Sequence, residues 1–532
     1  MDSNEVKQDI QKLISIFQKT MAENLYDERE EKIQVSHIMS HISSVYEKVR
    51  NAIDYSEEHL IRKNAIQRIL KRKIRVSINR KNIGKTLITE LIRAKYLENN
   101  FVPVSKIDEV ENVITKYLLL LDMIGKAKGV SAKLQHFDWI IGIASCEIEE
   151  RLNLLMRNDA MVNSMYQLLN KKVEFLNSSI DESERNLLFY IAVHRTLVKS
   201  DESILSFHLL NLYYPTFRRA DEKLISSIAK DIDLVHDNIA HYLRHPLAFK
   251  LSKFLQKHAV YFTVLRDVIE EDEKTAYVRI LNKDAFEDDI RSAANKRYKA
   301  TDNKLHRSIF NSVVYIFATK IVLAFALELP YEYFILNELR VLPLAINIIF
   351  PPVFMFALAS SAKLPTAQNT LAIIEGIKSI IYKDAPDQEK YGFKASSKRS
   401  VAKTVAFTLV YALIFFVSFG GVIYFLTFLE FNIVSILFFL LFFSVVSFLG
   451  IKIRSSVKTL TVLKVKEGFL SSLIDFLFLP VLKVGQWISM KFSKINVFAI
   501  FLDFIIEAPF KTVIEMIEEW FSFMKEKKEE IL

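Results

Sequence analysis

Two uncharged stretches decide the fold of this chain: VAFTLVYALIFFVSFGGVIYFLTFL at residues 405–429 and IVSILFFLLFFSVVSFLGI at residues 433–451. An α-helix rises about 1.5 Å per residue, so roughly 20 apolar residues cross the hydrocarbon core of a bilayer. Both stretches are near or above that length, and neither contains an Asp, Glu, Lys, Arg or His residue. The sequence therefore predicts two membrane-spanning helices joined by a short turn.

Two further apolar stretches precede this pair. Residues 308–327 are interrupted only by Lys320, and residues 341–359 contain Asn347 and the pair Pro351–Pro352. Proline lacks a backbone N–H, and its ring clashes with the carbonyl of the preceding turn. We therefore expect a second span that is kinked or interrupted at the prolines, and four spans in total.

The charged flanks predict the orientation of these spans. Lysine and arginine are abundant before the first span, in the loop 360–404 and after the fourth span, whereas the two remaining loops contain only Arg340 among their acidic residues. Loops rich in lysine and arginine stay in the cytoplasm. We expect a multi-pass protein of the cell membrane, with its N-terminal region, the loop 360–404 and its C-terminus in the cytoplasm.

Residues 1–307 differ sharply in composition, because they are rich in charge and poor in glycine and proline. Such a scarcity of helix breakers favours long helices. One apolar stripe recurs at steps of three and four residues, as on one face of a helix: Val110, Val113, Ile114, Tyr117, Leu118 and Leu121. We predict a soluble helical domain at 1–307, with a possible joint at 99–103 or 158–159.

The C-terminal residues 452–532 contain two apolar stretches that are too short to span a bilayer. Residues 469–482 include Asp475, and residues 495–506 include Asp503. Glu507 follows Asp503 one helical turn later, on the same face. We expect these segments to be re-entrant or to lie as amphipathic helices in the membrane interface on the cytoplasmic side.

The predicted fold class is therefore all-α. It combines a large cytoplasmic helical N-terminal domain, a four-helix transmembrane domain at 308–451 and re-entrant or interfacial helices at 452–532. Cys146 is the only cysteine, so no intrachain disulfide can form.

Lys320 is the most unusual residue of the predicted membrane region. A charge at the bilayer centre costs at least about 2.5–3.5 kcal/mol, so this side chain should face protein or water. Asn347 in the second span and Glu328, two turns along the same helix, are possible neighbours. A transport pathway and a lysine that only fixes helix packing are both compatible with this position. The polar or helix-breaking positions within the membrane region are Lys320, Asn347, Pro351, Pro352, Asp475, Asp503 and Glu507.

One set of histidines and aspartates follows a four-residue step: Asp233, Asp237, His241 and His245. Carboxylates and imidazoles on one helix face could bind a divalent metal. The same stripe is also what the solvated face of an amphipathic helix contains. We expect no bound cofactor and keep these residues as a metal candidate.

Residues 59–89 contain no acidic residue and carry a dense group of cations: Arg62, Lys63, Arg68, Lys71, Arg72, Lys73, Arg75, Arg80, Lys81 and Lys85. A solvated or internally paired basic face is one interpretation. Anionic lipid headgroups are another, since each cation near a membrane surface contributes about 1 kcal/mol. Nucleic acid is a weaker candidate, because the segment lacks the aromatic side chains on which bases stack.

No recognisable catalytic motif appears, so we expect a protein that is not an enzyme. The leading hypothesis is a scaffold that binds a protein partner through residues 1–307 at the cytoplasmic face of the membrane. An ion channel or transporter that uses Lys320 and the Pro351–Pro352 break is the alternative. A membrane enzyme that acts on lipid is a third hypothesis. Membrane lipids and a second copy of the chain are further expected partners.

Overall fold

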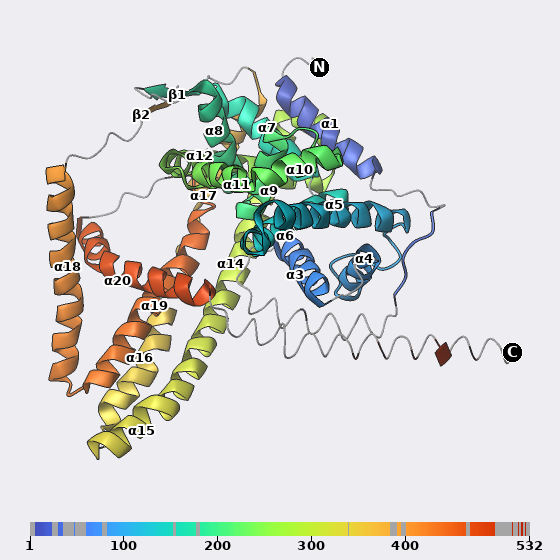
Figure 1. Cartoon of the computed structure of the whole chain (residues 1–532). Helices are drawn as coiled ribbons and strands as arrows, with labels where there is room; N and C mark the ends of the chain where they lie inside the picture. The colour runs from blue at the N-terminus through green and yellow to red at the C-terminus, as the bar shows by residue number, and fades with distance from the viewer. Residues whose placement is uncertain are drawn as a thin grey trace. The chain divides into compact units, whose positions relative to one another are not determined.

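The structure is a computed structural model that describes residues 6–23, 30–35, 47, 60–76, 82–152, 156–176, 181–338, 340–383, 391–394, 401–463, 469–494, 513, 516, 520, 523–524 and 527. The described chain is almost entirely helical, which confirms the all-α prediction (Figure 1). It forms two compact units. Unit 1 comprises residues 1–286, 377–395 and 508–532, and unit 2 comprises residues 287–376 and 396–507.

Unit 1 is a bundle of helices with one small sheet. Its elements are α1 (Gln8–Glu23), α3 (Ile61–Val76), α4 (Ile83–Arg93), α5 (Ser105–Lys128), α6 (Val130–Arg151), α7 (Met156–Asn170), β1 (Val173–Leu176), α8 (Glu182–Leu197), α9 (Glu202–Tyr213), η2 (Phe217–Arg219), α10 (Glu222–Lys230), α11 (Ile232–Arg244), α12 (Pro246–Glu271), α13 (Ala276–Leu281) and β2 (Tyr391–Lys394).

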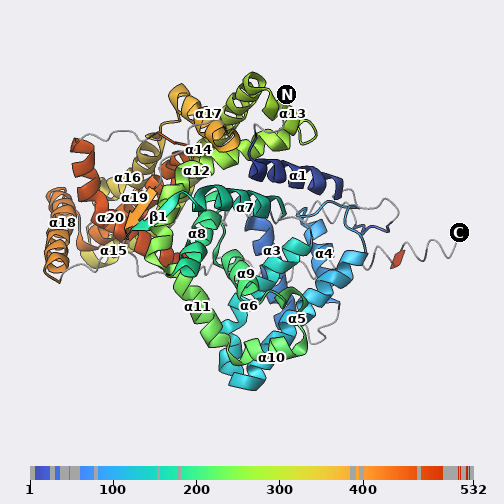
Figure 2. The same ribbon diagram turned by 90° about the horizontal axis from the view of Figure 1, so that it is seen from above.

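Helices α5 and α6 form an antiparallel pair in unit 1; they lie side by side and are joined at Gly129 (Figure 2). Gly129 has a φ of 90°, a backbone conformation that suits glycine because it has no Cβ. The apolar stripe of residues 110–121 is buried on α5, as its periodicity predicts. Other helices of unit 1 also pack in pairs, including α8 on α12 and α1 on α7.

A two-stranded parallel sheet escapes detection in the sequence. Strand β1 pairs with β2 in the register Val173↔Tyr391, although more than two hundred residues separate them. Four-residue strands are too short to show a convincing period of two. The neighbouring segment is also fixed to the N-terminus, because Lys7 donates its N–H to Ile381 O (2.9 Å) and its Nζ to Ser379 O (2.7 Å). Part of the loop 360–404 therefore belongs to unit 1.

The two possible joints have different structures. Residues 158–159 lie in the first turn of α7 and not in a linker. Residues 99–103 do lie in the connection between α4 and α5, where Ile33 N donates to Val102 O (2.9 Å). The composition boundary at residue 308 falls inside a helix.

Unit 2 contains four helices that are long and apolar enough to cross a membrane, as predicted. Its elements are α14 (Lys283–Leu323, entering from unit 1), η3 (Ala324–Glu328), α15 (Leu329–Tyr331), η4 (Glu332–Leu336), α16 (Val341–Ser360), α17 (Ala367–Ile381, ending in unit 1), α18 (Val401–Phe428), α19 (Ile433–Lys458) and α20 (Phe469–Lys494).

Helix α16 runs from Val341 to Ser360 with Pro351 and Pro352 inside it, so the prolines do not interrupt the span, while the expected kink stays a prediction. Both prolines are buried where α16 packs along α19. Proline has a φ compatible with a helix. This packing favours a continuous helix, although Asn347 O and Ile348 O lose the N–H donors that non-proline residues would supply.

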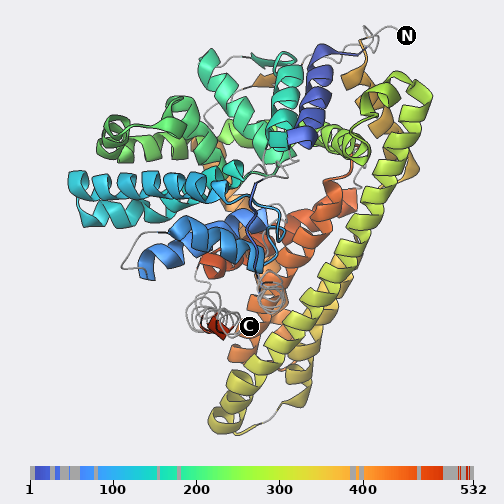
Figure 3. The ribbon, with the colours of Figure 1, turned by 90° about the vertical axis from the view of Figure 1, so that its right-hand side faces the viewer.

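The first span is longer than the sequence suggests. A continuous helix extends from Lys283 to Leu336, seen as the long yellow-green helix in Figure 3. It remains helical past residue 327 because η3 and η4 are π-helical stretches. Glu332, which the sequence places in a loop, is therefore a helix residue like Glu328, and both are fully buried.

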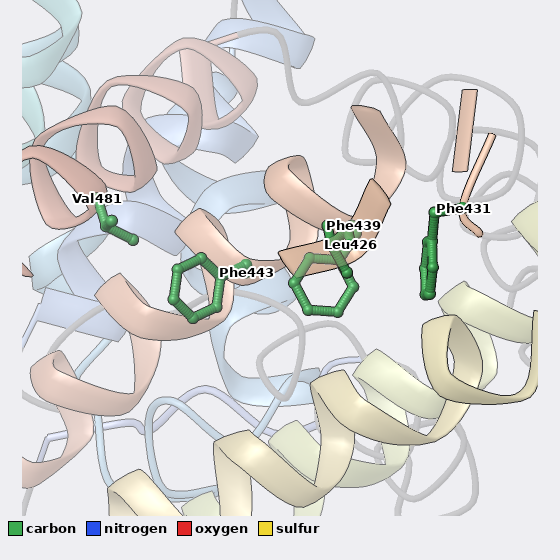
Figure 4. Close-up of a cluster of buried hydrophobic side chains, with 5 residues drawn as sticks. All are labelled: Leu426, Phe431, Phe439, Phe443 and Val481. Atoms are coloured by element: carbon green, nitrogen blue, oxygen red, sulfur yellow. The ribbon is translucent and has the colours of Figure 1, made fainter. Parts of the chain in front are cut away.

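The spans of unit 2 are joined by aromatic packing. Leu426, Phe431, Phe439, Phe443 and Val481 form one buried cluster (Figure 4). Helix α20 contributes Val481 and packs closely against α19: a Cβ built on Gly485 would lie 2.0 Å from Ser444 O. Small residues permit such close approach between membrane helices. Helix α20 thus lies directly against two of the candidate spans, α18 and α19.

Candidate functional site

A buried ion pair joins Lys320 to Glu328 within the first span. Residues eight apart in a regular α-helix point about 80° away from each other, at about 100° per residue. The π-helix Ala324–Glu328 lies between them, and a π-turn inserts one residue. The pair is then arranged like residues seven apart, about 20° from alignment. Lys320 Nζ donates to Glu328 Oε1, and both residues are 0% exposed.

Asn347 connects this ion pair to two other helices. From α16, its Nδ2 donates to Glu328 Oε2 (2.7 Å) and to Ser435 O at the start of α19 (3.2 Å). Both amide hydrogens are therefore used. Asn347 Oδ1 and Ser435 Oγ are buried and have no hydrogen-bond partner among the described residues. Buried polar atoms almost always have partners, so these two oxygens need an explanation.

Aromatic rings enclose the ammonium group of Lys320. Nζ lies 4.8 Å from the centroid of the Phe442 ring and 5.4 Å from that of Phe438. One turn earlier, Ile316 belongs to a buried apolar cluster with Met355, Phe442 and Val446. The network is therefore closed towards the charged half of α14.

A second buried carboxylate, Glu332, lies one helical turn beyond Glu328. Asn432 Nδ2 donates to Glu332 Oε1 (2.8 Å), and Arg340 N donates to Glu332 Oε2 (3.3 Å). The Arg340 guanidinium instead contacts Glu430 O (2.7 Å) and Glu338 (3.1 Å). Among the described residues, no lysine or arginine side chain forms an ion pair with Glu332.

The described network thus contains two fully buried carboxylates and one fully buried ammonium, which pairs with Glu328. If Glu328 and Glu332 are both ionised, the cluster carries one uncompensated negative charge. An isolated charge in an apolar medium is very unfavourable, so a proton or a bound cation must neutralise it. We call Lys320, Glu328, Glu332, Asn347, Asn432 and Ser435 the polar network.

Four of these six residues were not among the sequence candidates. The sequence presents Glu328 only as a possible neighbour of Lys320, and Glu332 only as a loop residue. The available signal was their four-residue spacing at the end of an apolar stretch. Of the other membrane candidates, Asp475 is exposed on α20, and Asp503 and Glu507 lie outside the described residues.

The histidine and aspartate stripe is divided among different contacts. Asp233 binds His136 Nε2 (2.7 Å) and also Lys128, whereas His245 Nδ1 accepts from Leu247 N at the start of α12 (3.3 Å). Asp237 Oδ1 lies 3.3 Å from His236 Nδ1. The part of the chain that the structure describes contains no group of three or more metal-ligating side chains suited to a metal ion.

The basic segment is largely paired with carboxylates inside unit 1. Arg62 contacts Glu149, Lys63 contacts Asp201, Arg68 contacts Glu47, Lys71 and Arg75 contact Asp138, and Arg72 contacts Glu90. Arg80 and Lys81 lie outside the described residues. The local charge is therefore offset by acids distant in the sequence, which favours the interpretation of an internally paired face.

Unit 1 contains a second buried lysine–glutamate pair. Lys116 Nζ donates to Glu147 (2.7 Å) and to Phe217 O (3.2 Å), and Tyr117 Oη donates to Glu147 Oε2 (2.8 Å). The pair borders a cavity of about 390 Å³. Burial lowers the pKa of Lys116, while Glu147 opposes the shift. Burial and the adjacent Glu147 raise the pKa of Tyr117 well above its usual value.

Comparison of the chain with protein-family models, with curated proteins and with solved structures finds no match. Its function is therefore inferred from the geometry of its own residues.

Proposed function

We propose that this chain is a multi-pass membrane protein that binds a small cation or a proton at Glu328 and Glu332 and moves it across the membrane as a channel or transporter. One observation carries the proposal: the carboxylates of Glu328 and Glu332 are both fully buried, and only Glu328 forms an ion pair with the buried ammonium of Lys320 among the described residues. Ionisable residues are costly inside membranes and typically mark ion or proton pathways. The π-helical stretches that contain Glu328 and Glu332 support the same proposal, because π-turns are frequent at functional sites.

The test is ion flux in proteoliposomes that contain the full chain. We expect wild-type protein to pass H⁺, Na⁺ or K⁺, and Glu328→Gln and Glu332→Gln to reduce that flux at least tenfold. Glu338→Gln is the matched control, because Glu338 lies on the same connection but its side chain is 65% exposed. Wild-type protein that is folded and inserted but passes none of these ions would refute the proposal.

The proposed orientation places unit 1 in the cytoplasm. Residues 6–286 and 377–395 belong to the same unit, and two candidate spans lie between them, which fits a hairpin that enters and leaves at one membrane face. In a Cys146→Ser background, we expect a membrane-impermeant maleimide to label Glu338→Cys on intact cells and not Lys383→Cys. The reverse pattern would invert the orientation.

A partner-binding role is the second candidate function. Val130 (70% exposed), Leu134 (70%) and Leu234 (65%) flank the contact that Asp233 makes with His136. Exposed apolar side chains in one neighbourhood favour a protein interface. We expect a protein that copurifies with the chain from its native membrane to be lost from Leu134→Glu and Leu234→Glu variants. Recovery of the copurifying protein in equal amounts with wild type, Leu134→Glu and Leu234→Glu would count against this role.

A further inference from the structure

We infer that Glu328, Asn347 and Ser435 form a binding site for Na⁺ or K⁺, and that the Lys320 ammonium is a built-in cation that competes for it. This inference rests on the proposed function and names its ligand class and its regulation. Three observations support it: the buried oxygens without partners, the excess of acceptors over donors, and the few bonds that Lys320 makes.

The oxygens of the site come from two helices that meet at Glu328. Asn347 Oδ1 and Ser435 Oγ are buried and unpartnered, on residues that are 0% and 1% exposed. Asn347 Nδ2 already donates to Glu328 and to Ser435 O. Rotating the amide by 180° would direct Oδ1 at these two acceptors and lose both hydrogen bonds. A ligand that offers positive charge to oxygen would satisfy both atoms.

Acceptors outnumber donors throughout this neighbourhood. Pro351 has no N–H, so Asn347 O also lacks the donor that a regular helix would supply. Carboxylate, amide, hydroxyl and main-chain oxygens together are the ligands of hard cations. Histidine and cysteine, which softer metals prefer, do not occur among the residues that these groups contact in the described chain.

Lys320 occupies the cation position with few bonds. Among the described residues it donates to one protein oxygen, Glu328 Oε1, and Nζ also lies over the rings of Phe438 and Phe442. Ring faces attract a cation, yet they accept no conventional hydrogen bond from the two other N–H groups. A mobile cation that takes over Glu328 would leave Lys320 held only by these rings, so lysine and cation would bind Glu328 alternately.

The experiment replaces the built-in cation with one from solution. Lys320→Met keeps the long apolar stem and removes the charge, so Glu328 needs another partner. The purified full chain is heated in NaCl, in KCl or in choline chloride at equal ionic strength. A cation at ten times its Kd should raise the unfolding midpoint of Lys320→Met by about 3–6 °C over choline. Wild type should shift much less, because its lysine competes.

The double variant Lys320→Met/Glu328→Gln is the matched control, since it removes both charges and should unfold at the same temperature in all three salts. Lys320→Gln is the second variant, should methionine itself prevent folding. Equal midpoints of the single variants in NaCl, KCl and choline, or equal failure to fold in all three, would overturn the inference. A midpoint that depends on pH but not on the salt would identify a proton as the occupant and also overturn it.

Failure of this site and failure of the proposed function are distinguishable. A salt-dependent midpoint in Lys320→Met without any flux through wild-type protein would support the cation site and refute transport. Flux that responds only to a proton gradient, with no salt dependence of the midpoint, would support transport and refute the site.

Discussion

The two units each bury a lysine–glutamate pair, and the pairs differ in how completely they are bonded. In unit 1, Glu147 receives hydrogen bonds from Lys116 and Tyr117 and lies 3.7 Å from Arg151, while Lys116 also donates to a main-chain carbonyl. In unit 2, Lys320 has one protein oxygen, and unpartnered oxygens lie close to its carboxylate. The ion pair of unit 1 therefore has several hydrogen-bond partners, whereas the ion pair of unit 2 has few.

This difference suits the two ion pairs to different roles: the pair of unit 1 stabilises helix packing, and the pair of unit 2 can be displaced by a competing cation. A pair with several alternative partners holds its helices together when one bond is lost, and the cavity beside Lys116 gives water a route to it. A pair that depends on a single bond breaks completely when that bond is lost. We therefore expect the membrane pair to be the more fragile and the more responsive to a competing cation.

The largest expected effect is that of Glu328→Gln. It leaves the Lys320 ammonium buried without a counter-charge, and removing one partner of a buried pair costs about 3–5 kcal/mol. Denaturant or thermal unfolding of the purified protein in detergent measures the loss. Adding Lys320→Met should restore most of the stability, because the unpaired charge is then gone. Costs that simply add in the double variant would mean that the two residues do not interact.

A smaller effect is the pH dependence of stability that His258 gives to unit 1. His258 in unit 1 lies among Phe254, Tyr261 and Tyr391, and neither ring nitrogen has a hydrogen-bond partner in the described part of the chain. Burial lowers its pKa to about 3, with Lys257 and Lys172 adding to the shift. Below pH 6.5 the unfolded chain binds a proton that the folded chain refuses, so stability falls as the pH falls from 6.5 towards 3.

His258→Phe removes this proton linkage. Between pH 7 and pH 4 the variant should lose about 3 kcal/mol less than wild type, at about 1.36 kcal/mol per pKa unit. Unfolding midpoints across this pH range measure the difference. Parallel pH curves for both proteins would show that His258 is protonated in the fold.

The unit 1 ion pair should tolerate a change better than its counterpart. Glu147→Gln keeps an acceptor for Tyr117, and Lys116 retains Phe217 O and the adjacent cavity. We expect a loss of about 1–3 kcal/mol, the usual cost of an unsatisfied buried group. Unfolding of Glu147→Gln beside Glu328→Gln provides the comparison. If Glu147→Gln loses more unfolding free energy than Glu328→Gln, the pair of unit 1 is the more fragile one and the comparison between the two pairs is wrong.

The sequence predicts the helices better than it predicts their polar contacts. Uncharged runs at 405–429 and 433–451 anticipate α18 and α19, and the stripe at 110–121 anticipates α5, because periodicity and length depend on local residues. Glu332 and Ser435 are not recognised, since their burial depends on π-turns and on the approach of a distant helix. Charge density near residue 70 allows an internally paired face but cannot name its partners, because the neutralising carboxylates come from other helices.

The smallest expected effect concerns this basic segment. Lys71 Nζ lies 2.9 Å from Asp138 Oδ1, but the two side chains are 29% and 68% exposed. Exposed pairs contribute about 0.2–1 kcal/mol and are screened by salt. Lys71→Gln should therefore lower stability by less than about 1 kcal/mol at low salt, and the difference from wild type should vanish in concentrated salt. The effect of Glu328→Gln should persist there, because a buried pair is screened far less. A loss of stability in Lys71→Gln that persists in concentrated salt would instead show that Lys71 belongs to a buried network like that of Lys320. The exposed fraction of a side chain would then not distinguish the ion pairs of the two units.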